Sequence, residues 1–263
     1  MTLCINYVTK SGIAIAASDS LITTTKYKQP TASFLPTNEE ILHQTPYAVK
    51  VHNITGVKAY TCDNIDILVT IAGNVLLGLQ CALHIESYLK HGYNLWPRDI
   101  ELAIESKIHD FWRDARDRSI KMSFSFFDHK RNPVLLECRA TGPGDFNFGR
   151  VESQGDFILS VLGDGDDTAK ASILSKANAY TYTHSVDEAI HIASLSALQH
   201  AIDDPTKIFI GGHVQASRLQ HFNSQYLVAD YEGDKYFRGT MLDDYDRLDL
   251  PILDMTDKAY SIR

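Results

Sequence analysis

The sequence predicts an α+β protein in which antiparallel sheets pack together and helices lie outside them. Segments with strand-like alternation gather at the beginning, the middle and the end of the 263-residue chain, and two blocks with helical spacing of apolar residues lie between them. Segregated blocks of strands and helices are typical of this fold class. Because no linker or internal repeat divides the chain, we expect residues 1–263 to form a single domain.

The first strand block opens at the N-terminus. Residues 3–9 alternate imperfectly, KSG at 10–12 favours a turn, and IAIAAS at 13–18 follows as a second strand, so we expect a β-hairpin. Residues 23–46 are polar and contain three prolines, which predicts a long loop. Beyond it, YAVKVHNI at 47–54 and NIDILVTIAG at 64–73 predict two more strands.

Helices are predicted in two blocks, separated by strands. Apolar residues at helical spacing predict helices at 74–92, 96–119, 167–177 and 185–202. Ser185 and Glu188 form the sequence pattern of a capping box at the start of the last one. Strands are predicted by a hairpin pattern around DHKRNP at 120–141, by DFILSVLGDG at 156–165, and by two final segments at 207–219 and 225–233.

Composition narrows the class of protein. The chain is 44% hydrophobic with a formal net charge of −8, which disfavours a nucleic-acid surface because phosphate binding needs a basic footprint. Its four cysteines lack zinc-ligand spacing and favour reduced, buried thiols. No apolar run reaches the roughly 20 residues of a membrane span, and the N-terminus lacks signal-peptide organisation. We therefore expect a soluble cytoplasmic protein.

Thr2, directly behind Met1, is the first candidate for chemistry. An N-terminal threonine is a complete catalytic unit, because its hydroxyl is a nucleophile and its own α-amine is the base. That amine has a reference pKa of about 7.7–8.0, close to the working pH. The unit exists only after Met1 is removed, and many ordinary proteins also begin with Met-Thr.

The other candidate residues have ordinary structural interpretations. Lys50, between two valines, fits an edge strand that faces solvent, and Asp19 after AAS fits a turn. Asp203, before Asp204 and a proline, fits a helix stop. GDGDD at 163–167 lacks the remaining ligands of a calcium loop and fits a turn. We therefore expect no metal site.

The ordered set of motifs resembles proteasome β-subunit-type N-terminal nucleophile (Ntn) hydrolases, most closely the bacterial HslV and Anbu-like proteins. The matching elements run from Thr2 to about Gly212 and are, in order, TLC, ASDS, AVKVHNI, TIAGN, LGDG, SVDEAIHIASLSAL and DDPT. The resemblance implies a four-layer αββα sandwich of two antiparallel sheets. It also implies a threonine-type peptidase that needs no metal or organic cofactor.

The same resemblance implies a role for each matched residue. Thr2 is the nucleophile, Lys50 lies near its hydroxyl and amine, and Asp19 holds both by charge-assisted hydrogen bonds. The Gly73 amide is the oxyanion donor, where one such donor is typically worth about 2.7–4 kcal/mol. Asp203 and Thr206 match residues that support the N-terminus in the family. Thr23 matches a position in the strand that pairs with a bound peptide.

Three features depart from the family pattern. Thr2 and Asp19 are 19 − 2 = 17 steps apart, one more than usual, so a β-bulge is needed to keep Asp19 on the correct face. Asp19 and Lys50 are 50 − 19 = 31 steps apart, which is also longer than usual. Asp164 replaces the family's serine beside the α-amine, and its carboxylate would raise the pKa of that amine.

The partners implied are a peptide or unfolded protein as substrate and further copies of the chain, in a ring or a helical homo-oligomer. An ATPase partner is not identified, and neither nucleic acid nor membrane is expected. Two alternative functions stay open. One is a catalytically silent or attenuated ring-forming scaffold, favoured by Asp164 and by retention of Met1. The other is an Ntn amidohydrolase of small amides.

Overall fold

In the computed structural model, the described part of the chain begins with a β-hairpin. The residues described are 2–25, 48–55, 59–61, 66–91, 97–114, 119–128, 130–142, 145–163, 165–207, 209–220, 223–238, 240–243, 249–256 and 259–263. Strands β1 (Leu3–Thr9) and β2 (Ile13–Asp19) form the hairpin, and their pairs run from Cys4 opposite Ser18 to Val8 opposite Ala14 without a register shift.

The hairpin belongs to a nine-stranded sheet. Strand β10 (Phe157–Gly163) pairs with β1, and β11 (Val214–Gln220) pairs with β2, both antiparallel. The sheet continues from β11 through later strands of the chain. These are β12 (Asn223–Tyr231), β13 (Asp234–Phe237), β14 (Thr240–Met241), β15 (Ile252–Asp254) and β16 (Ser261–Ile262).

A second, five-stranded antiparallel sheet packs against the first. Its strands follow one another in the order of the chain. They are β5 (Ala59–Thr61), β6 (Leu68–Gly73), β7 (Ile120–Phe127), β8 (Pro133–Gly142) and β9 (Asp145–Arg150). Strands β3 (Leu21–Thr25) and β4 (Ala48–Thr55) form a separate two-stranded antiparallel sheet that continues from β2.

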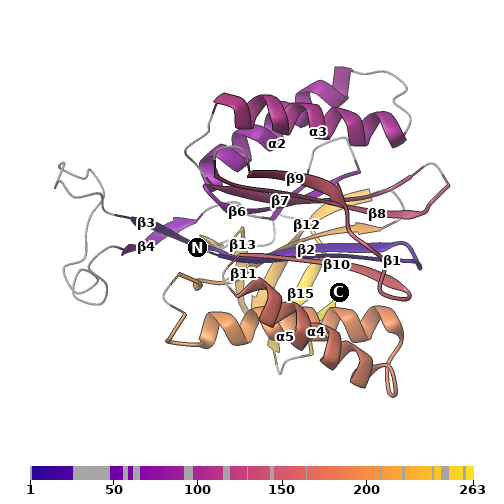
Figure 1. The fold of residues 1–263 in the computed structure, drawn as a ribbon. Helices are drawn as coiled ribbons and strands as arrows, with labels where there is room; N and C mark the ends of the chain where they lie inside the picture. Colours follow the sequence, from indigo (N-terminus) through magenta and orange to yellow (C-terminus); the bar gives the residue numbers. More distant parts are fainter. Residues whose placement is uncertain are drawn as a thin grey trace.

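Two pairs of helices cover the outer faces of the two sheets, which gives four layers in the order α, β, β, α (Figure 1). Helices α2 (Val75–His91) and α3 (Pro97–Asp114) cover the five-stranded sheet. Helices α4 (Asp166–Tyr180) and α5 (Val186–Asp203) cover the nine-stranded sheet. The expected α+β sandwich of two antiparallel sheets is therefore confirmed.

The two largest apolar cores lie between each sheet and its helices. In β1 and β7 alternate residues face the helix layers, because side chains along a strand alternate between its two faces. Leu3, Ile5 and Tyr7 pack toward α4 and α5, and Met122, Phe124 and Phe126 pack toward α2 and α3. All six side chains are almost fully buried.

The layer between the two sheets is more polar. Asn6 of β1 donates a hydrogen bond from Nδ2 to Oγ of Ser123 in β7 over 3.1 Å, and Thr70 Oγ1 lies 2.5 Å from the same oxygen. Ser123, Ser125 and Ser160 are completely buried in this layer. Short polar side chains allow the sheets to approach, and the hydroxyl groups of Ser123 and Ser160 bond across the interface.

Several sequence predictions are confirmed element by element. The N-terminal hairpin, the four helices, the hairpin of β7 and β8, and the Ser185–Glu188 capping box are all present. Strands β3, β5, β9 and β13–β16 were not predicted. The predicted strand at 207–219 was too long, because β11 begins only at Val214. Of the predicted loop 23–46, residues 23–25 extend β3, and the rest lies outside the described residues.

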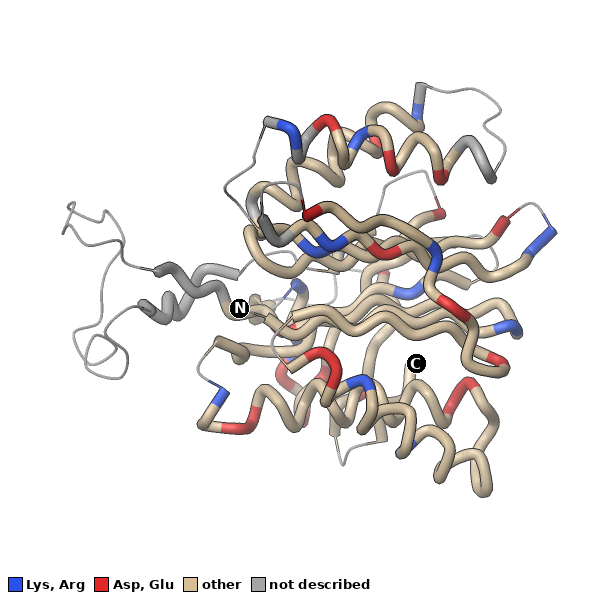
Figure 2. The backbone as a smooth tube through the Cα atoms, viewed as in Figure 1, with Lys and Arg blue, Asp and Glu red and all other residues tan. Residues whose placement is uncertain are grey.

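Three of the four cysteines are described, and all three are buried free thiols: Cys4, Cys81 and Cys138. Burial raises the pKa of Cys81 to about 12, and burial together with the neighbouring Cys81 and Glu137 does the same for Cys138. Acidic and basic residues are interspersed over the helices and strands (Figure 2). Within the described part of the chain, no helix has the length and hydropathy that crossing a bilayer requires.

Candidate active site

Thr2 and Asp19 meet at the open end of the N-terminal hairpin. Thr2 directly precedes β1, Asp19 is the last residue of β2, and both are buried, with 2% and 0% of their surface exposed. The Thr2 hydroxyl donates a hydrogen bond to the Asp19 carboxylate. The same carboxylate accepts from the backbone amides of Leu3 over 3.1 Å and Gly211 over 3.2 Å. Asp19 therefore fixes the threonine side chain and the backbone around it.

The hairpin turn explains how Asp19 reaches Thr2 across the seventeen-step separation. The paired residues of β1 and β2 contain no bulge, and the turn between them consists of residues 10–12. Gly12 has φ +100°, a conformation that glycine adopts most readily and that is typical of three-residue hairpin loops. The expected β-bulge is thus absent from the paired strands, and Asp19 still contacts the threonine.

The loop before β11 holds the other side of Asp19. The Leu21 amide donates to the Gly211 carbonyl over 3.1 Å, and the His213 amide donates to Ser20 Oγ over 3.0 Å. Gln215 Nε2 donates to the Asp19 carbonyl over 3.1 Å. These bonds tie the loop before β11 and the start of β11 to the end of β2.

Gly163, the last residue of β10, lies directly against the N-terminus. It pairs with Leu3, has φ +128°, and a methyl group in place of its hydrogen would overlap the carbonyl oxygen of Thr2. Gly165, with φ +71°, begins α4, and a methyl group there would lie 3.6 Å from Lys207 Nζ. Asp164, between these glycines, lies outside the described residues. The turn therefore borders Thr2 on one side and a lysine ammonium on the other.

Gly73 occupies the junction between β6 and α2. Its φ is +93°, and an added methyl group would lie 2.7 Å from the Ser119 carbonyl oxygen, so the position requires glycine. Asn74 next to it caps α2, because its Oδ1 accepts from the Leu77 amide over 3.0 Å.

The neighbours of three site residues form one buried cluster. Cys4, which follows Thr2 by two residues, packs against Ala72 and Leu162, which precede Gly73 and Gly163. The Cys4 thiol also donates to the Ile71 carbonyl over 3.2 Å. This cluster brings the N-terminus, the start of α2 and the start of α4 to one end of the inter-sheet layer.

The structure also brings the backbones of Thr23 and Lys50 together. The two residues face each other in the β3–β4 pair, where the register shifts between Leu21 and Ile22. Their side chains lie outside the described part of the structure. The proposed contact of the Lys50 ammonium with Thr2 therefore stays a prediction.

Asp203 and Thr206 lie at the surface, at the end of α5. Asp203 accepts from Gln199 Nε2 over 2.8 Å, and Thr206 bonds through both its amide and its hydroxyl to the Asp204 carboxylate. Both residues are exposed. They shape the segment that leads to Gly211, and within the described part of the chain neither of them bonds to Thr2.

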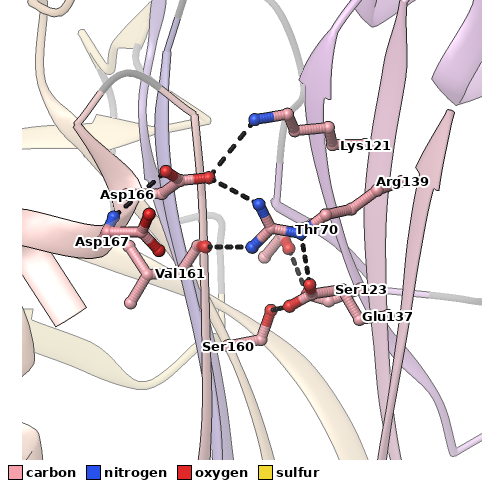
Figure 3. A network of polar contacts seen from close by, with 9 residues as sticks. All are labelled: Thr70, Lys121, Ser123, Glu137, Arg139, Ser160, Val161, Asp166 and Asp167. Atoms are coloured by element: carbon pink, nitrogen blue, oxygen red, sulfur yellow. Dashed lines mark hydrogen bonds and ion pairs between the residues drawn. The ribbon is translucent and has the colours of Figure 1, made fainter. Parts of the chain in front are cut away.

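A network of charges next to the 163–165 turn was missed by the sequence analysis (Figure 3). Asp166, the first residue of α4, accepts from Lys121 Nζ over 3.2 Å and from Arg139 Nη1 over 2.9 Å. Arg139 also pairs with Glu137, which accepts from Ser160 Oγ over 2.6 Å. Charged residues at inward positions of β7 and β8 were the available signal. The network ties the start of α4 to the opposite sheet.

The pKa of the Asp166 carboxyl reflects this network. Burial alone would raise the pKa, but the charges and hydrogen bonds of Lys121 and Arg139 outweigh it and hold the pKa below its usual value. Asp166 is therefore a carboxylate at neutral pH, able to anchor the helix start. Among the described residues, no three His, Cys, Asp or Glu side chains gather closely enough to hold a metal ion.

The fold is similar to that of a solved structure. The fold matches Anbu, the ancestral β-subunit from Yersinia bercovieri, with a TM-score of 0.57 and 12% identity over 85% of this chain and 86% of that chain. The fold is proteasome-like. No protein-family model matches the sequence, and no curated protein matches it significantly. The similarity to Anbu therefore concerns the fold, and the chemistry must be argued from the residues.

Proposed function

We propose that the chain is a threonine-type Ntn hydrolase that cleaves peptide bonds through an acyl-enzyme on Thr2 after Met1 is removed. The observation that supports this most directly is the buried hydrogen bond from the Thr2 hydroxyl to Asp19, at the start of a proteasome-like fold. A threonine that only packed in a core would not need a carboxylate that also binds the amides of Leu3 and Gly211.

The proposed reaction uses the threonine as both nucleophile and base. Loss of Met1 converts the Thr2 amide nitrogen into an α-amine, which takes the proton from the hydroxyl as the oxygen attacks the scissile carbonyl. The Gly73 amide donates to the resulting oxyanion. The protonated amine then gives its proton to the leaving amine, and it activates the water that releases the acyl group. Lys50 stabilises the charge that develops on the threonine oxygen.

Peptides are the proposed substrates, and the β3–β4 sheet supports this choice. Of the described strands, β4 is the only partner of β3, and we propose that an extended peptide pairs with the other edge of β3 at Thr23. We also propose that the chain assembles with further copies into a ring or helical homo-oligomer that encloses these sites, in the cytoplasm.

Intact-mass measurement combined with a covalent probe tests the proposal. The protein is expected to lack the mass of Met1 and to gain one epoxyketone or β-lactone adduct per chain. The adduct should be absent in Thr2→Ala and present in Thr183→Ala, which removes an exposed threonine hydroxyl. Peptide mapping should place the adduct on Thr2.

Two other outcomes would support the alternative functions. Retained methionine and no adduct would contradict catalysis and favour the silent scaffold. An adduct on Thr2 in a protein that hydrolyses acylated amino acids but no fluorogenic peptide would favour the small-amide hydrolase. A panel that contains both substrate classes separates the two.

A further inference from the structure

A cavity of about 480 Å³ lies between the nine-stranded sheet and helix α5, and nothing in the proposed reaction uses it. Its floor includes Tyr7, Ile15 and Arg218 from three adjacent strands, its roof includes Asp187 and His191, and the C-terminal segment 259–262 forms a wall. The volume is in the range of small-molecule sites, about 300–1,000 Å³.

The floor places the cavity away from Thr2. Tyr7 pairs with Ile15, and Ile15 pairs with Arg218, so these residues form one row across β1, β2 and β11. Gln220, opposite Ile13, lies next in the same direction and on the same face of β11. The row lies toward the closed end of the hairpin, whereas Thr2 lies at the open end.

A buried hydrogen-bond chain fixes the acceptor side of the cavity. His191 Nε2 bonds to the carbonyl oxygen of Tyr260, which only accepts, so Nε2 carries the proton. His191 Nδ1 therefore accepts from the Tyr7 hydroxyl over 2.7 Å. The Tyr7 hydroxyl donates its only proton in this bond, so its oxygen can act only as an acceptor toward a donor in the cavity. Asp187 lies close enough to help burial raise the pKa of Tyr7.

Arg218 supplies the donor side. Its side chain is partly buried, and burial lowers the pKa of its guanidinium. Neither Arg218 nor Asp187 has a side-chain hydrogen bond or ion pair in the described structure, and they do not pair with each other. A partly buried cation and a partly buried carboxylate thus line one cavity, and both are available to a ligand that carries the complementary charges.

We propose that this cavity binds a short zwitterionic peptide, with its ammonium group at Asp187 and Tyr7 and its carboxylate at Arg218. Tyr7 and Arg218, at the two ends of the row, lie two strand spacings apart, which is about 10 Å. An extended chain spans about 3.3–3.6 Å per residue, so a dipeptide or tripeptide fits better than a free amino acid. Ile13, Ile15 and Ile262 in the lining favour apolar side chains.

The test measures binding of Leu-Leu by calorimetry to the Thr2→Ala protein, which removes the proposed nucleophile and keeps the peptide intact. Arg218→Gln and Asp187→Asn are each expected to weaken binding by about tenfold or more, as expected for loss of one charge-assisted hydrogen bond. N-acetyl-Leu-Leu and Leu-Leu-amide should bind the unchanged cavity about tenfold more weakly or worse, since each lacks one terminal charge. Blocked peptides test the idea even if a variant fails to fold.

Lys130→Gln and Glu152→Gln, which remove exposed charges outside the cavity, should leave the affinity for Leu-Leu unchanged. The proposal would be overturned by absence of Leu-Leu binding, by equal binding of blocked and free peptides, or by leucine binding as tightly as Leu-Leu. Because binding is measured in a protein that lacks the nucleophile, the result tests the cavity proposal independently of the proposed hydrolysis.

Discussion

The Asp19 carboxylate accepts a hydrogen bond from the Thr2 hydroxyl and thereby joins the residue before β1 to the last residue of β2. It also accepts hydrogen bonds from two backbone amides, so at least three donors surround its oxygens. We predict that Asp19→Asn destabilises the fold by about 1–3 kcal/mol, because one carboxylate oxygen becomes an NH₂ group that cannot accept from the donors at that position, and the negative charge is lost. The adduct at Thr2 should form at least about tenfold more slowly for the same reason.

Urea unfolding and the rate of probe labelling measure the two effects. Asp156→Asn is the control, since Asp156 is an exposed partner of Lys10 in a surface ion pair, and it should change neither quantity appreciably. Labelling of Asp19→Asn at the unchanged rate would show that the carboxylate does not position the nucleophile.

The close approach of Gly163 to Thr2 leads to a second prediction, which concerns the stability of the fold. In Gly163→Ala the new methyl group overlaps the Thr2 carbonyl oxygen and the backbone also has φ +128°, so both clash and strain are introduced. Gly155→Ala introduces strain alone, since Gly155 has φ +80° and open space around it. The strain typically costs about 1–2 kcal/mol. Gly163→Ala should lose clearly more free energy of unfolding than this control, and equal losses would contradict the close approach.

Local patterns were sufficient to predict most of the secondary structure. The spacing of apolar residues identified α2–α5, and the capping box placed the start of α5. The alternation of Ser and Phe in β7 predicts a strand but does not show what covers its serine face, because alternation is usual for a sheet with one solvated face. Here Ser123 and Ser125 are buried against the other sheet, and this follows from the packing of distant strands.

The candidate site was predicted in part. Thr2 and Asp19 were found through an ordered set of motifs, and the structure brings them into contact. Gly211, Lys121 and Asp166 were missed because their places near the site depend on which strands become neighbours. A single sequence contains no direct signal of such pairings, and the charges inside β7 and β8 were its only indication.

The ion pairs of Asp166 predict a loss of stability in acid. The pKa of Asp166 is held low by Lys121 and Arg139 despite burial, so its carboxylate stabilises the folded state above the unfolded-state pKa of about 3.9. This contribution disappears as the pH falls through the lower pKa of the folded state. Asp166→Asn should therefore be less stable than the parent at pH 7, and the difference should shrink below about pH 4.

Urea unfolding at several pH values between about 3 and 7 measures this difference. Asp167→Asn is the matched control, because Asp167 is the neighbouring carboxylate and forms no ion pair in the described structure. A difference between Asp166→Asn and the parent that stays constant down to the lowest pH would show that the ion pairs are not its source.

The glycine turn at 163–165 predicts the pH dependence of the proposed hydrolysis. The α-amine must be neutral to accept the proton of the Thr2 hydroxyl, so the rate should rise as the pH passes the pKa of that amine. Asp164 in this turn would raise the pKa, whereas the Lys207 ammonium, close to Gly165, would lower it. Asp164→Ser should therefore move the rise to lower pH, and Lys207→Gln should move it to higher pH.

The profile of kcat/KM against pH for a fluorogenic peptide measures both shifts in one assay. Opposite shifts are expected because the two substitutions remove charges of opposite sign from the surroundings of one amine. Glu232→Gln, at an exposed turn far along the chain, controls for the change in net charge and should leave the midpoint in place. Shifts in the same direction, or no shift in either variant, would contradict the proposed action of these two charges on the α-amine.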